Sequence, residues 1–476
     1  MTSKTKTNFR WVICAMLFVA TAVNYLDRQV LSLTWDEFIK PEFHWNESHY
    51  GTITSLFSII YAICMLFAGR FVDWMGTKKG YLWAIGVWSA GACAHALCGV
   101  VTESVVGLNT AAELVQATGD TAVLISTISM YCFIVARSIL ALGEAGNFPA
   151  AIKTTAEYFP KKDRAFATSI FNAGASIGAL FAPLTIPLLA KNFGWEISFI
   201  IIGALGFIWM GFWVFLYDRP ETSKHVSKEE LAYIEQDKEL DNEKTSENGT
   251  AKKLGFMECL RYRQTWAFAV GKFMTDGVWW FFLFWTPSYL NTQFGIKTSD
   301  PKGMALIFTL YAITMLSIYG GKLPTIFINN AMRKGQTFDP YAARMKAMLI
   351  FAFLPLVVLL AQPLGRISPW FPVILIGIGA AAHQSWSANI FSTVGDMFPK
   401  SSIATITGIG GIGSMFLQKV AGELFVYSEQ VNLSFLGFSG KPAGYFIIFC
   451  VCATAYLIGW CIMKALVPKY KVITLN

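Results

Sequence analysis

Charged residues are scarce in this chain, and hydrophobic residues are abundant. Only 14% of the 476 residues are Asp, Glu, Lys or Arg, and 54% are hydrophobic. Soluble domains carry charge on about a quarter of their residues. So little charge does not cover the surface of a protein of this size, and the composition excludes an ordinary soluble protein.

The sequence also lacks the motifs of common metal and disulfide sites. It has only five histidines and no HExxH pattern, and its nine cysteines include no CxxC pair and no Cys/His ligand spacing. A zinc site or a disulfide framework would require such spacings. We therefore expect free thiols, no bound metal, no cofactor and no enzymatic activity.

Long apolar runs are separated by short polar segments. Each run is roughly 20 residues long, the length of helix that crosses a bilayer core of about 30 Å. Residues 200–213 are apolar on every face, which excludes the alternating pattern of a porin-like barrel. We predict an all-α integral membrane protein with twelve transmembrane helices, at residues 11–33, 50–72, 80–101, 124–150, 165–190, 196–217, 264–290, 303–328, 344–363, 369–395, 402–427 and 443–466.

The net charge is +8, and it is distributed unevenly along the chain. The connections after even-numbered spans are rich in Lys and Arg, whereas residues 101–125 contain neither. Cytoplasmic loops carry an excess of these residues. We therefore expect a multi-pass protein of the inner (plasma) membrane with both termini in the cytoplasm, and the basic excess needs no nucleic-acid partner.

Residues 218–263 form the one long polar stretch. Within it, Ser227 and Glu230 make a capping-box pattern before a charged run through Leu240, which predicts a short surface helix. We interpret the stretch as a cytoplasmic linker between two six-helix bundles, residues 1–217 and residues 264–476.

The two halves share a repeated pattern. Residues 157–161 (Glu-Tyr-Phe-Pro-Lys) match residues 396–400 (Asp-Met-Phe-Pro-Lys) at an offset of 239 residues. A segment of small residues follows each match, at 172–178 and at 408–414. Pseudo-symmetric bundles of this kind are typical of alternating-access transporters, which bind substrate between the two halves.

Ionisable residues inside a membrane span are costly, and they therefore mark functional sites. Tyr25, Asp27 and Arg28 lie in the first span, and Arg137 and Glu144 lie seven residues apart on one face of the fourth. A guanidinium group binds a carboxylate through two parallel hydrogen bonds. This pattern favours a small anionic substrate, with Tyr25, Arg28 and Arg137 among its ligands.

Asp27 and Glu144 are the candidates for proton coupling. Burial favours the neutral form of a carboxyl group and nearby arginines favour the charged form, so we expect both groups to exchange protons during transport. An anion that enters the cell moves against the membrane potential, and proton symport would drive it. The alternative is that Asp27/Arg28 and Arg137/Glu144 are structural ion pairs.

The second half adds an unusually polar tenth span. His383 is separated from Glu144 by the repeat offset, so we expect these residues to face each other across a central cavity; the alternative is a histidine bonded to a neighbouring helix. The aromatic run at residues 279–285 either stacks on a sugar ring or marks the membrane interface. The expected substrate-binding residues of this half are Lys272, His383, Gln384 and Asn389.

A short loop after the second span combines glycines with charges. Its expected functional residues are Gly69, Asp73, Gly76, Lys78 and Lys79. We expect the glycines to allow close helix approach, Asp73 to lie at a helix end and the lysines to face the cytoplasm. We assign this loop a structural and gating role.

The same loop resembles the signature of the major facilitator superfamily, although Trp74 and Thr77 depart from it. Residues 24–28 (Asn-Tyr-Leu-Asp-Arg) and 137–149 resemble its anion:cation symporter family, which includes bacterial hexuronate and galactonate transporters and vesicular glutamate and sialic acid carriers. Residues 382–387 (Ala-His-Gln-Ser-Trp-Ser) are most similar to the hexuronate transporters.

The resemblance implies the major facilitator fold and assigns roles by motif. Asp27 and Glu144 match the proton-coupling residues of the family, and Arg28 and Arg137 match residues that bind the substrate carboxylate or gate access to it. Tyr61 matches a tyrosine that contacts the sugar acid.

Ala175 stands where galactonate carriers have a glutamine, which favours a ring-closed uronic acid over an open-chain aldonate. The resemblance therefore implies a proton-coupled symporter in the lipid bilayer that imports a hexuronate, glucuronate or galacturonate. We further expect a monomer, and protons rather than sodium as the coupling ion. Two alternatives stay open. One is a symporter for another organic anion, such as galactonate or sialic acid, and the other is a membrane sensor that does not transport.

Overall fold

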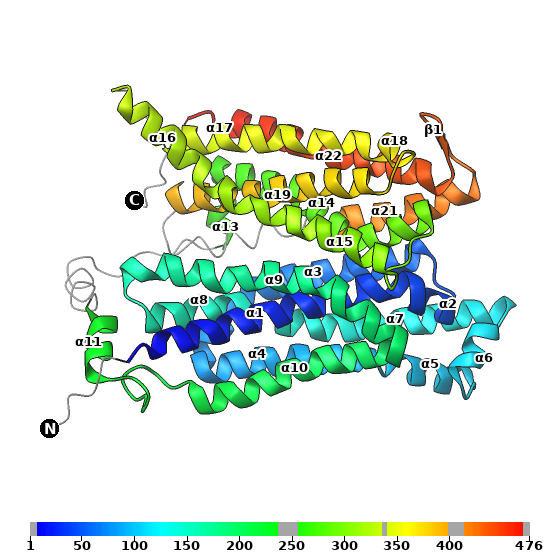
Figure 1. The fold of residues 1–476 in the computed structure, drawn as a ribbon, viewed down its shortest axis with the longest axis horizontal. Coiled ribbons are helices and arrows are strands. Elements are labelled where there is room, and N and C mark those ends of the chain that lie inside the picture. Colours follow the sequence, from blue (N-terminus) through cyan, green and yellow to red (C-terminus); the bar gives the residue numbers. More distant parts are fainter. Residues whose placement is uncertain (1–6, 237–255, 336–339, 398–413, 470–476) are drawn as a thin grey trace.

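The computed structural model describes residues 7–236, 256–335, 340–397 and 414–469. Helices make up almost all of the described chain, apart from a short antiparallel hairpin of strands β1 (Ser434–Phe435) and β2 (Phe438–Ser439). Figure 1 shows long helices running side by side in two groups, one from each half of the chain.

The first group consists of long, mostly continuous helices. Such lengths suit a bilayer crossing, which needs about 20 helical residues. The long helices are α1 (Phe9–Thr34), α3 (Glu47–Met75), α4 (Thr77–His95), α7 (Gly119–Glu144), α9 (Lys161–Phe193) and α10 (Trp195–Leu216). Between them lie η1 (Trp35–Ile39), α2 (Lys40–Phe43), α5 (Cys98–Val106), α6 (Ala111–Gln116) and α8 (Asn147–Tyr158).

The second group has more interruptions, because 3-10 segments break two of its membrane helices. Its elements are α14 (Arg263–Phe294), α15 (Pro301–Thr314), η2 (Met315–Lys322), α16 (Leu323–Arg333), α17 (Pro340–Phe353), η3 (Leu354–Leu360), α18 (Ala361–Gly365), α19 (Trp370–Met397), α21 (Ser414–Gln430) and α22 (Lys441–Leu466). The linker contributes α11 (Lys228–Glu235) and α13 (Phe256–Cys259).

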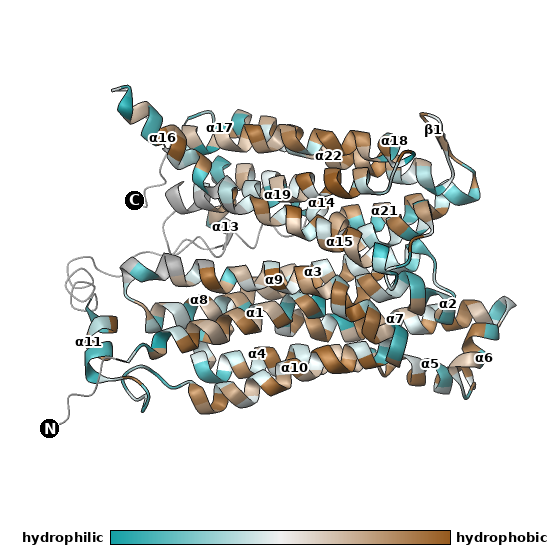
Figure 2. Cartoon of the chain, viewed as in Figure 1, coloured by the Kyte–Doolittle hydropathy of each residue, from teal (hydrophilic) through white to brown (hydrophobic). Residues whose placement is uncertain are grey.

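The predicted helical membrane architecture is confirmed. Seven described helices are long and apolar enough to cross a membrane, or eight if the α4/α5 pair, bent by 47°, is one span. Hydrophobic residues cover the middle of the helix bundle and hydrophilic residues gather at its two ends (Figure 2). Four predicted spans fall on helices outside this apolar set, namely α14, α15 with α16, α19 and α21. Residues 402–413, the first part of the span predicted at 402–427, lie outside the described residues.

Part of the predicted repeat lies outside the described residues. The match at residues 157–161 lies at the end of α8 and the start of α9. Residues 398–400 of the second match, and all but the last residue of the segment 408–414, lie outside the described residues.

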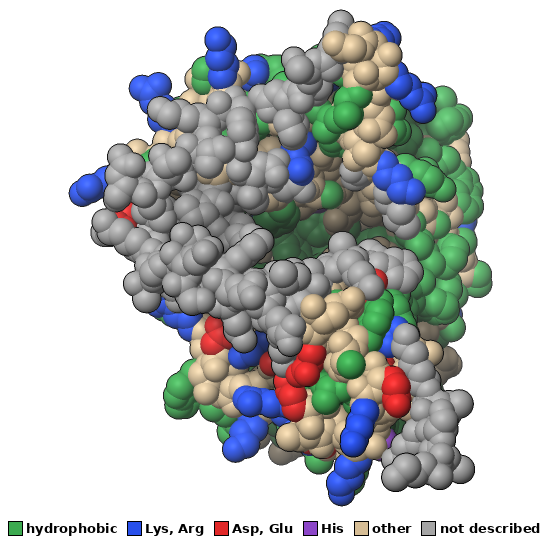
Figure 3. All heavy atoms as spheres, turned by 90° about the vertical axis from the view of Figure 1, so that its left-hand side faces the viewer, with side chains coloured by type: hydrophobic (Ala, Val, Ile, Leu, Met, Phe, Trp, Pro, Cys, Tyr) green, Lys and Arg blue, Asp and Glu red, His purple; other side chains and the backbone are tan. Residues whose placement is uncertain are grey.

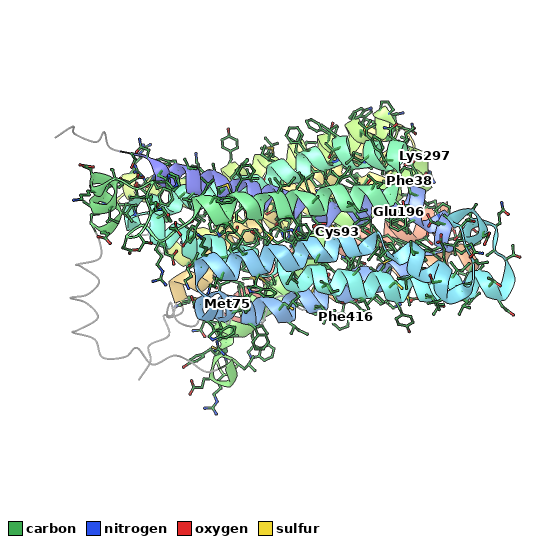
Figure 4. All side chains as sticks on the ribbon, turned by 90° about the horizontal axis from the view of Figure 1, so that it is seen from below. Phe38, Met75, Cys93, Glu196, Lys297 and Phe416 are labelled. Atoms are coloured by element: carbon green, nitrogen blue, oxygen red, sulfur yellow. The ribbon has the colours of Figure 1, made fainter. Side chains whose placement is uncertain are left out.

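The two ends of the bundle differ. α1 begins and α22 ends at the same end, called the N/C end below, and the opposite end is called the far end (Figure 1). Figure 4 places Met75 toward the N/C end and Phe38, Glu196 and Lys297 at the far end. The N/C end faces the viewer in Figure 3, which shows a hollow with hydrophobic side chains on its visible wall.

The linker helix α11 is anchored on the start of α1. Ser227 caps α11 as predicted, because its Oγ accepts a hydrogen bond from the Glu230 backbone N–H at 3.2 Å. The Glu230 carboxylate does not complete the predicted capping box. It accepts hydrogen bonds from the backbone N–H groups of Phe9 and Arg10, both at 3.0 Å, and from the Arg10 side chain at 3.2 Å. The free N–H groups of a helix start attract a carboxylate, and those of α1 lie within reach.

Replacing Glu230 with alanine should lower the thermal stability of the protein. The change leaves the Arg10 guanidinium and two backbone N–H groups without their acceptor, and an unmade buried hydrogen bond costs about 1–3 kcal/mol. Thermal unfolding of the purified protein in detergent would show a lower Tm. Glu229→Ala, on the exposed side of the same helix, is the matched control. Equal Tm values for the two variants would show that the contacts of Glu230 with the start of α1 do not stabilise the protein.

Candidate functional site

Arg28 of α1 and Glu144 of α7 form a buried ion pair. The Arg28 Nε and Nη2 donate to Glu144 Oε2 at 3.0 and 2.7 Å, and the two residues are 2% and 0% exposed. Among the described residues, Asp27/Arg28 and Arg137/Glu144 do not form the ion pairs considered as the structural alternative. The arginine of one span instead binds the glutamate of the other.

Aromatic rings from both halves surround the Arg28 guanidinium group. Its carbon lies 5.1 Å from the centroid of the Tyr25 ring and 4.8 Å from that of Tyr61. The third ring is Trp280 of α14, at 5.0 Å, and it belongs to the second half of the chain. Rings at these distances stabilise a cation, and more so where water is excluded.

Arg137 lies beside this ion pair with part of its guanidinium group unused. Its Nη2 donates to the Arg28 carbonyl oxygen at 3.3 Å, and its carbon lies 5.1 Å from the Phe57 ring centroid. The Arg137 Nε and Nη1, both carboxylate oxygens of Asp27 and the Asn24 amide are buried without a hydrogen-bond partner among the described residues. Each such group costs about 1–3 kcal/mol, so the cluster contains buried polar groups whose hydrogen-bonding capacity is unused within the described residues.

The second half holds a separate polar cluster on α14, α19 and α22. Lys272 and Asp276 form an ion pair one turn apart, with Nζ to Oδ2 at 2.7 Å. The His383 Nδ1 shares a hydrogen bond of 2.8 Å with the Tyr456 hydroxyl. The His383 ring also stacks on Trp279, with 5.5 Å between centroids and 10° between planes.

The other sequence-predicted residues of this half are less engaged. Gln384 is half-buried on α19. Asn389 is buried, and its Nδ2 donates to the Ser385 carbonyl oxygen of its own helix at 2.8 Å. His383 and Glu144 each bind a partner within their own half, so their placement face to face across the cavity stays a prediction.

The far end is closed by polar contacts between the halves. Glu37 accepts hydrogen bonds from the Thr298 hydroxyl at 3.0 Å and from the Ser299 backbone N–H and hydroxyl at 3.1 and 2.5 Å. The Lys441 Nζ lies 2.9 Å from Glu47 Oε1. The molecule is therefore sealed at the far end and hollow at the N/C end.

Helices α3 and α21 also meet at the far end with almost no space between their backbones. A Cβ added to Gly422 would lie 2.5 Å from the Glu47 carbonyl oxygen and 3.1 Å from the Gly51 Cα. Small residues allow this kind of close helix crossing in membranes. The sequence reveals neither glycine as a contact, because the pair spans the two halves.

The segment at residues 69–79 forms the end of α3 and the start of α4, and its glycines do not act as expected. A Cβ on Gly69 would meet no atom of the described residues within 4 Å, so none of the described helices approaches it closely. Gly76 has φ of +79° between α3 and α4, a backbone conformation that favours glycine. The expectation of close approach is therefore wrong for both residues, and Gly76 serves the turn.

The charged residues of this segment pair with one residue of the first half and with the first residue of the linker. The Lys153 Nζ lies 2.9 Å from Asp73 Oδ1, and the Lys78 Nζ lies 2.9 Å from Asp218 Oδ1. Asp73 belongs to the last turn of α3, and Lys79 is exposed. These partly exposed pairs contribute little to stability.

Three further residues contact the site. The sequence did not single out Phe57 or Tyr456, and it indicated Trp280 only as a member of the aromatic run at residues 279–285. The spacing of aromatic residues is a sequence signal for Phe57 and Trp280. Phe57 lies four residues before Tyr61 on α3, and Trp280 lies four residues before Phe284 on α14, so each pair shares a helical face. Tyr456 carries no such signal, because its role depends on how α22 packs against α19.

The chain has relatives along most of its length. It is 28% identical to the hexuronate transporter of Escherichia coli (strain K12), with 90% of this chain and 89% of that protein covered. It is 27% identical to the galacturonate transporter of Dickeya chrysanthemi, with 67% and 82% covered. The crystal structure of a D-xylose-proton symporter matches with a TM-score of 0.66 at 14% identity, covering 95% of this chain and 98% of that one. The family model described as Major Facilitator Superfamily matches residues 17–421. These findings confirm the resemblance seen in the sequence, and the chain belongs to the major facilitator superfamily.

Proposed function

We propose that the protein is a proton-coupled secondary transporter that imports a hexuronate, glucuronate or galacturonate, by alternating access. The observation that carries the proposal is the buried cluster of Arg28, Arg137, Asp27 and Glu144. Two guanidinium groups can bind a substrate carboxylate through hydrogen bonds, and two buried carboxyl groups can bind and release protons. The similarity to a hexuronate and a galacturonate transporter supports the sugar-acid class.

In the proposed mechanism, Arg137 receives the substrate carboxylate with its unpartnered donors. A proton on Glu144 weakens the hold of that residue on Arg28, and the freed guanidinium group then turns to the same carboxylate. Asp27 provides the second proton-binding group. Tyr25 and Tyr61 flank the Arg28 guanidinium group and offer hydroxyl groups to the sugar ring.

The second half completes the proposed site from the opposite side. Lys272, His383 and Gln384 offer polar groups from α14 and α19 to the hydroxyl groups of the sugar. Asn389 contributes its side-chain oxygen, since its Nδ2 is engaged with Ser385. A ring-closed uronic acid presents its carboxylate to one half and its hydroxyl groups to the other.

The transport cycle we propose rocks residues 1–217 against residues 264–476, with residues 218–263 as the linker. We place the N/C end in the cytoplasm of a cell with this protein in its inner membrane, on the strength of the basic connections at that end. The loop residues Gly69, Asp73, Gly76, Lys78 and Lys79 then belong to the cytoplasmic gate. A monomer contains both halves and is sufficient for this cycle.

Uptake of labelled glucuronate and galacturonate into liposomes that contain the purified protein tests the proposal. An imposed inward proton gradient should cause accumulation of at least one of the two. Accumulation without the gradient would contradict proton coupling. If galactonate accumulates and neither uronate does, the protein is a symporter for aldonates instead.

Replacing Arg137 with lysine should weaken substrate binding. Lysine keeps the charge but loses the planar pair of donors, and a charge-assisted hydrogen bond contributes about 1.5–3 kcal/mol. The KM for uronate uptake should rise about tenfold or more, since each 1.4 kcal/mol is a factor of ten. Arg261→Lys, at an exposed position, is the control, and an unchanged KM for Arg137→Lys would remove this residue from the site.

A further inference from the structure

Trp280 belongs to the second half of the chain, but its ring lies among residues of the first half. The ring centroid is 5.0 Å from the Arg28 guanidinium carbon. It also meets the rings of Tyr61 and Phe57 on α3 edge to face, at 6.5 Å in both cases. The charged cluster of the first half is thus covered on one side by a side chain of the other half.

The neighbouring Trp279 points elsewhere. It stacks on His383 within the second half. Trp280 instead packs on Phe284, one turn further along α14, with 5.2 Å between centroids. The Phe284 carbonyl oxygen accepts a hydrogen bond from the Tyr50 hydroxyl of α3 at 3.0 Å. Trp280 and Phe284 therefore form one strip of α14 that contacts the first half beside the closed far end.

Contacts within one half and contacts between halves behave differently when the halves rock. Arg28, Glu144, Tyr25 and Tyr61 all belong to the first half, so the rocking of the halves does not by itself separate them. The contact of Trp280 with Arg28 joins the halves, and opening of the far end moves α14 away from α1 and α3. Of the three rings around Arg28, the indole is thus the one that depends on conformation.

A ring over the guanidinium group strengthens the ion pair beneath it. The indole excludes water from one face of Arg28 and attracts its charge, and both effects favour the contact with the Glu144 carboxylate. We propose that Trp280 is a positioning residue that acts through Arg28: it stabilises the Arg28–Glu144 pair only while the far end is closed, and so links proton binding to the conformation of the transporter. This inference rests on the proposed function, and it identifies how the two halves communicate.

Two transport assays separate this role from a merely structural one. Exchange of labelled for unlabelled glucuronate at equal concentrations needs binding and rocking, whereas accumulation under a proton gradient also needs coupling. For Trp280→Leu we expect the exchange rate to stay within about threefold of wild type. Accumulation should fall about tenfold, which corresponds to the free energy of a desolvated cation–π contact. Trp280→Phe keeps a ring and should restore most of the accumulation.

Trp83→Leu is the matched control, because Trp83 is 59% exposed on α4, and it should change neither assay. A parallel fall of exchange and accumulation in Trp280→Leu would overturn the proposal in favour of a structural role. Normal accumulation would also overturn it. A higher KM for exchange with unchanged coupling would mean that Trp280 contacts the substrate itself.

A second measurement does not depend on the substrate. A double-mutant cycle measured by thermal unfolding compares four proteins: wild type, Trp280→Leu, Glu144→Gln and the double variant. We expect the effects to be non-additive, because both residues act on Arg28, and additive effects would overturn the inference. If the wild-type protein transports neither uronate but the cycle shows coupling, the proposed substrate is wrong and the role of Trp280 stands.

Discussion

Replacing Gly422 with valine should abolish net transport. The Cβ of any residue at this position would lie 2.5 Å from the Glu47 carbonyl oxygen and 3.1 Å from the Gly51 Cα, and both are backbone atoms of the other half. Backbone atoms of two long helices cannot move aside as a flexible side chain can, so the added atoms must push α21 away from α3. Overpacking costs about 1–3 kcal/mol even where side chains can adjust.

The energetic cost of the added side chain falls only on the conformation that is closed at the far end. In the state described here the far end is closed, whereas a state open at that end separates α3 from α21 and relieves the clash. A penalty of about 3 kcal/mol shifts this equilibrium by about a hundredfold. Gly422→Val should therefore remain folded, bind substrate from the far end and fail to release it at the N/C end.

Transport and local accessibility measure the two parts of this prediction. Gly422→Val should lose uptake. Thr298 is buried in the far-end contacts, and a cysteine introduced there by Thr298→Cys should become reactive to alkylation when combined with Gly422→Val. Peptide mass spectrometry would detect the alkylated cysteine. Gly211→Ala is the control, because a Cβ there meets no atom within 4 Å in the part of the chain that the structure describes. Normal uptake by Gly422→Val would show that the far end need not close this tightly.

The sequence alone is sufficient for the helical membrane class, and it also predicts two halves and a group of charged residues in the first half. These follow from local properties: apolar runs of bilayer length, the position of the polar linker, and charges that are rare inside apolar segments. Arg137 and Glu144 were placed on one face by their spacing in a single helix. Such features need no knowledge of how distant segments pack.

The partner of each charged residue could not be predicted. Adjacent residues such as Asp27 and Arg28 point in directions about 100° apart on a helix, and only the rotation of α1 against α7 decides that Arg28 reaches Glu144. The same reason applies to Trp280 and Gly422. Each acts on a residue of the other half, and neither local spacing nor composition records that contact.

The second large effect is expected from Glu144→Gln. Glutamine keeps the shape of the side chain and can still accept a hydrogen bond from Arg28, but it binds no proton. A gradient of one pH unit supports about tenfold accumulation for each coupled proton, so loss of coupling should reduce the accumulation ratio to that of simple equilibration. Exchange at equal concentrations should continue, because it requires no net movement of protons.

Asp27→Asn should give the same result for a different reason. Both carboxylate oxygens of Asp27 are buried without a partner among the described residues, so a neutral amide removes proton binding without breaking an ion pair. Glu229→Gln, on the exposed face of α11, controls for the loss of a carboxylate. Glu144→Gln alters the pairing of Arg28 whereas Asp27→Asn does not, so a lower thermal stability should appear only in the former. Concentrative uptake by both variants would mean that the driving proton binds elsewhere in the chain, and the buried cluster would then serve the substrate alone.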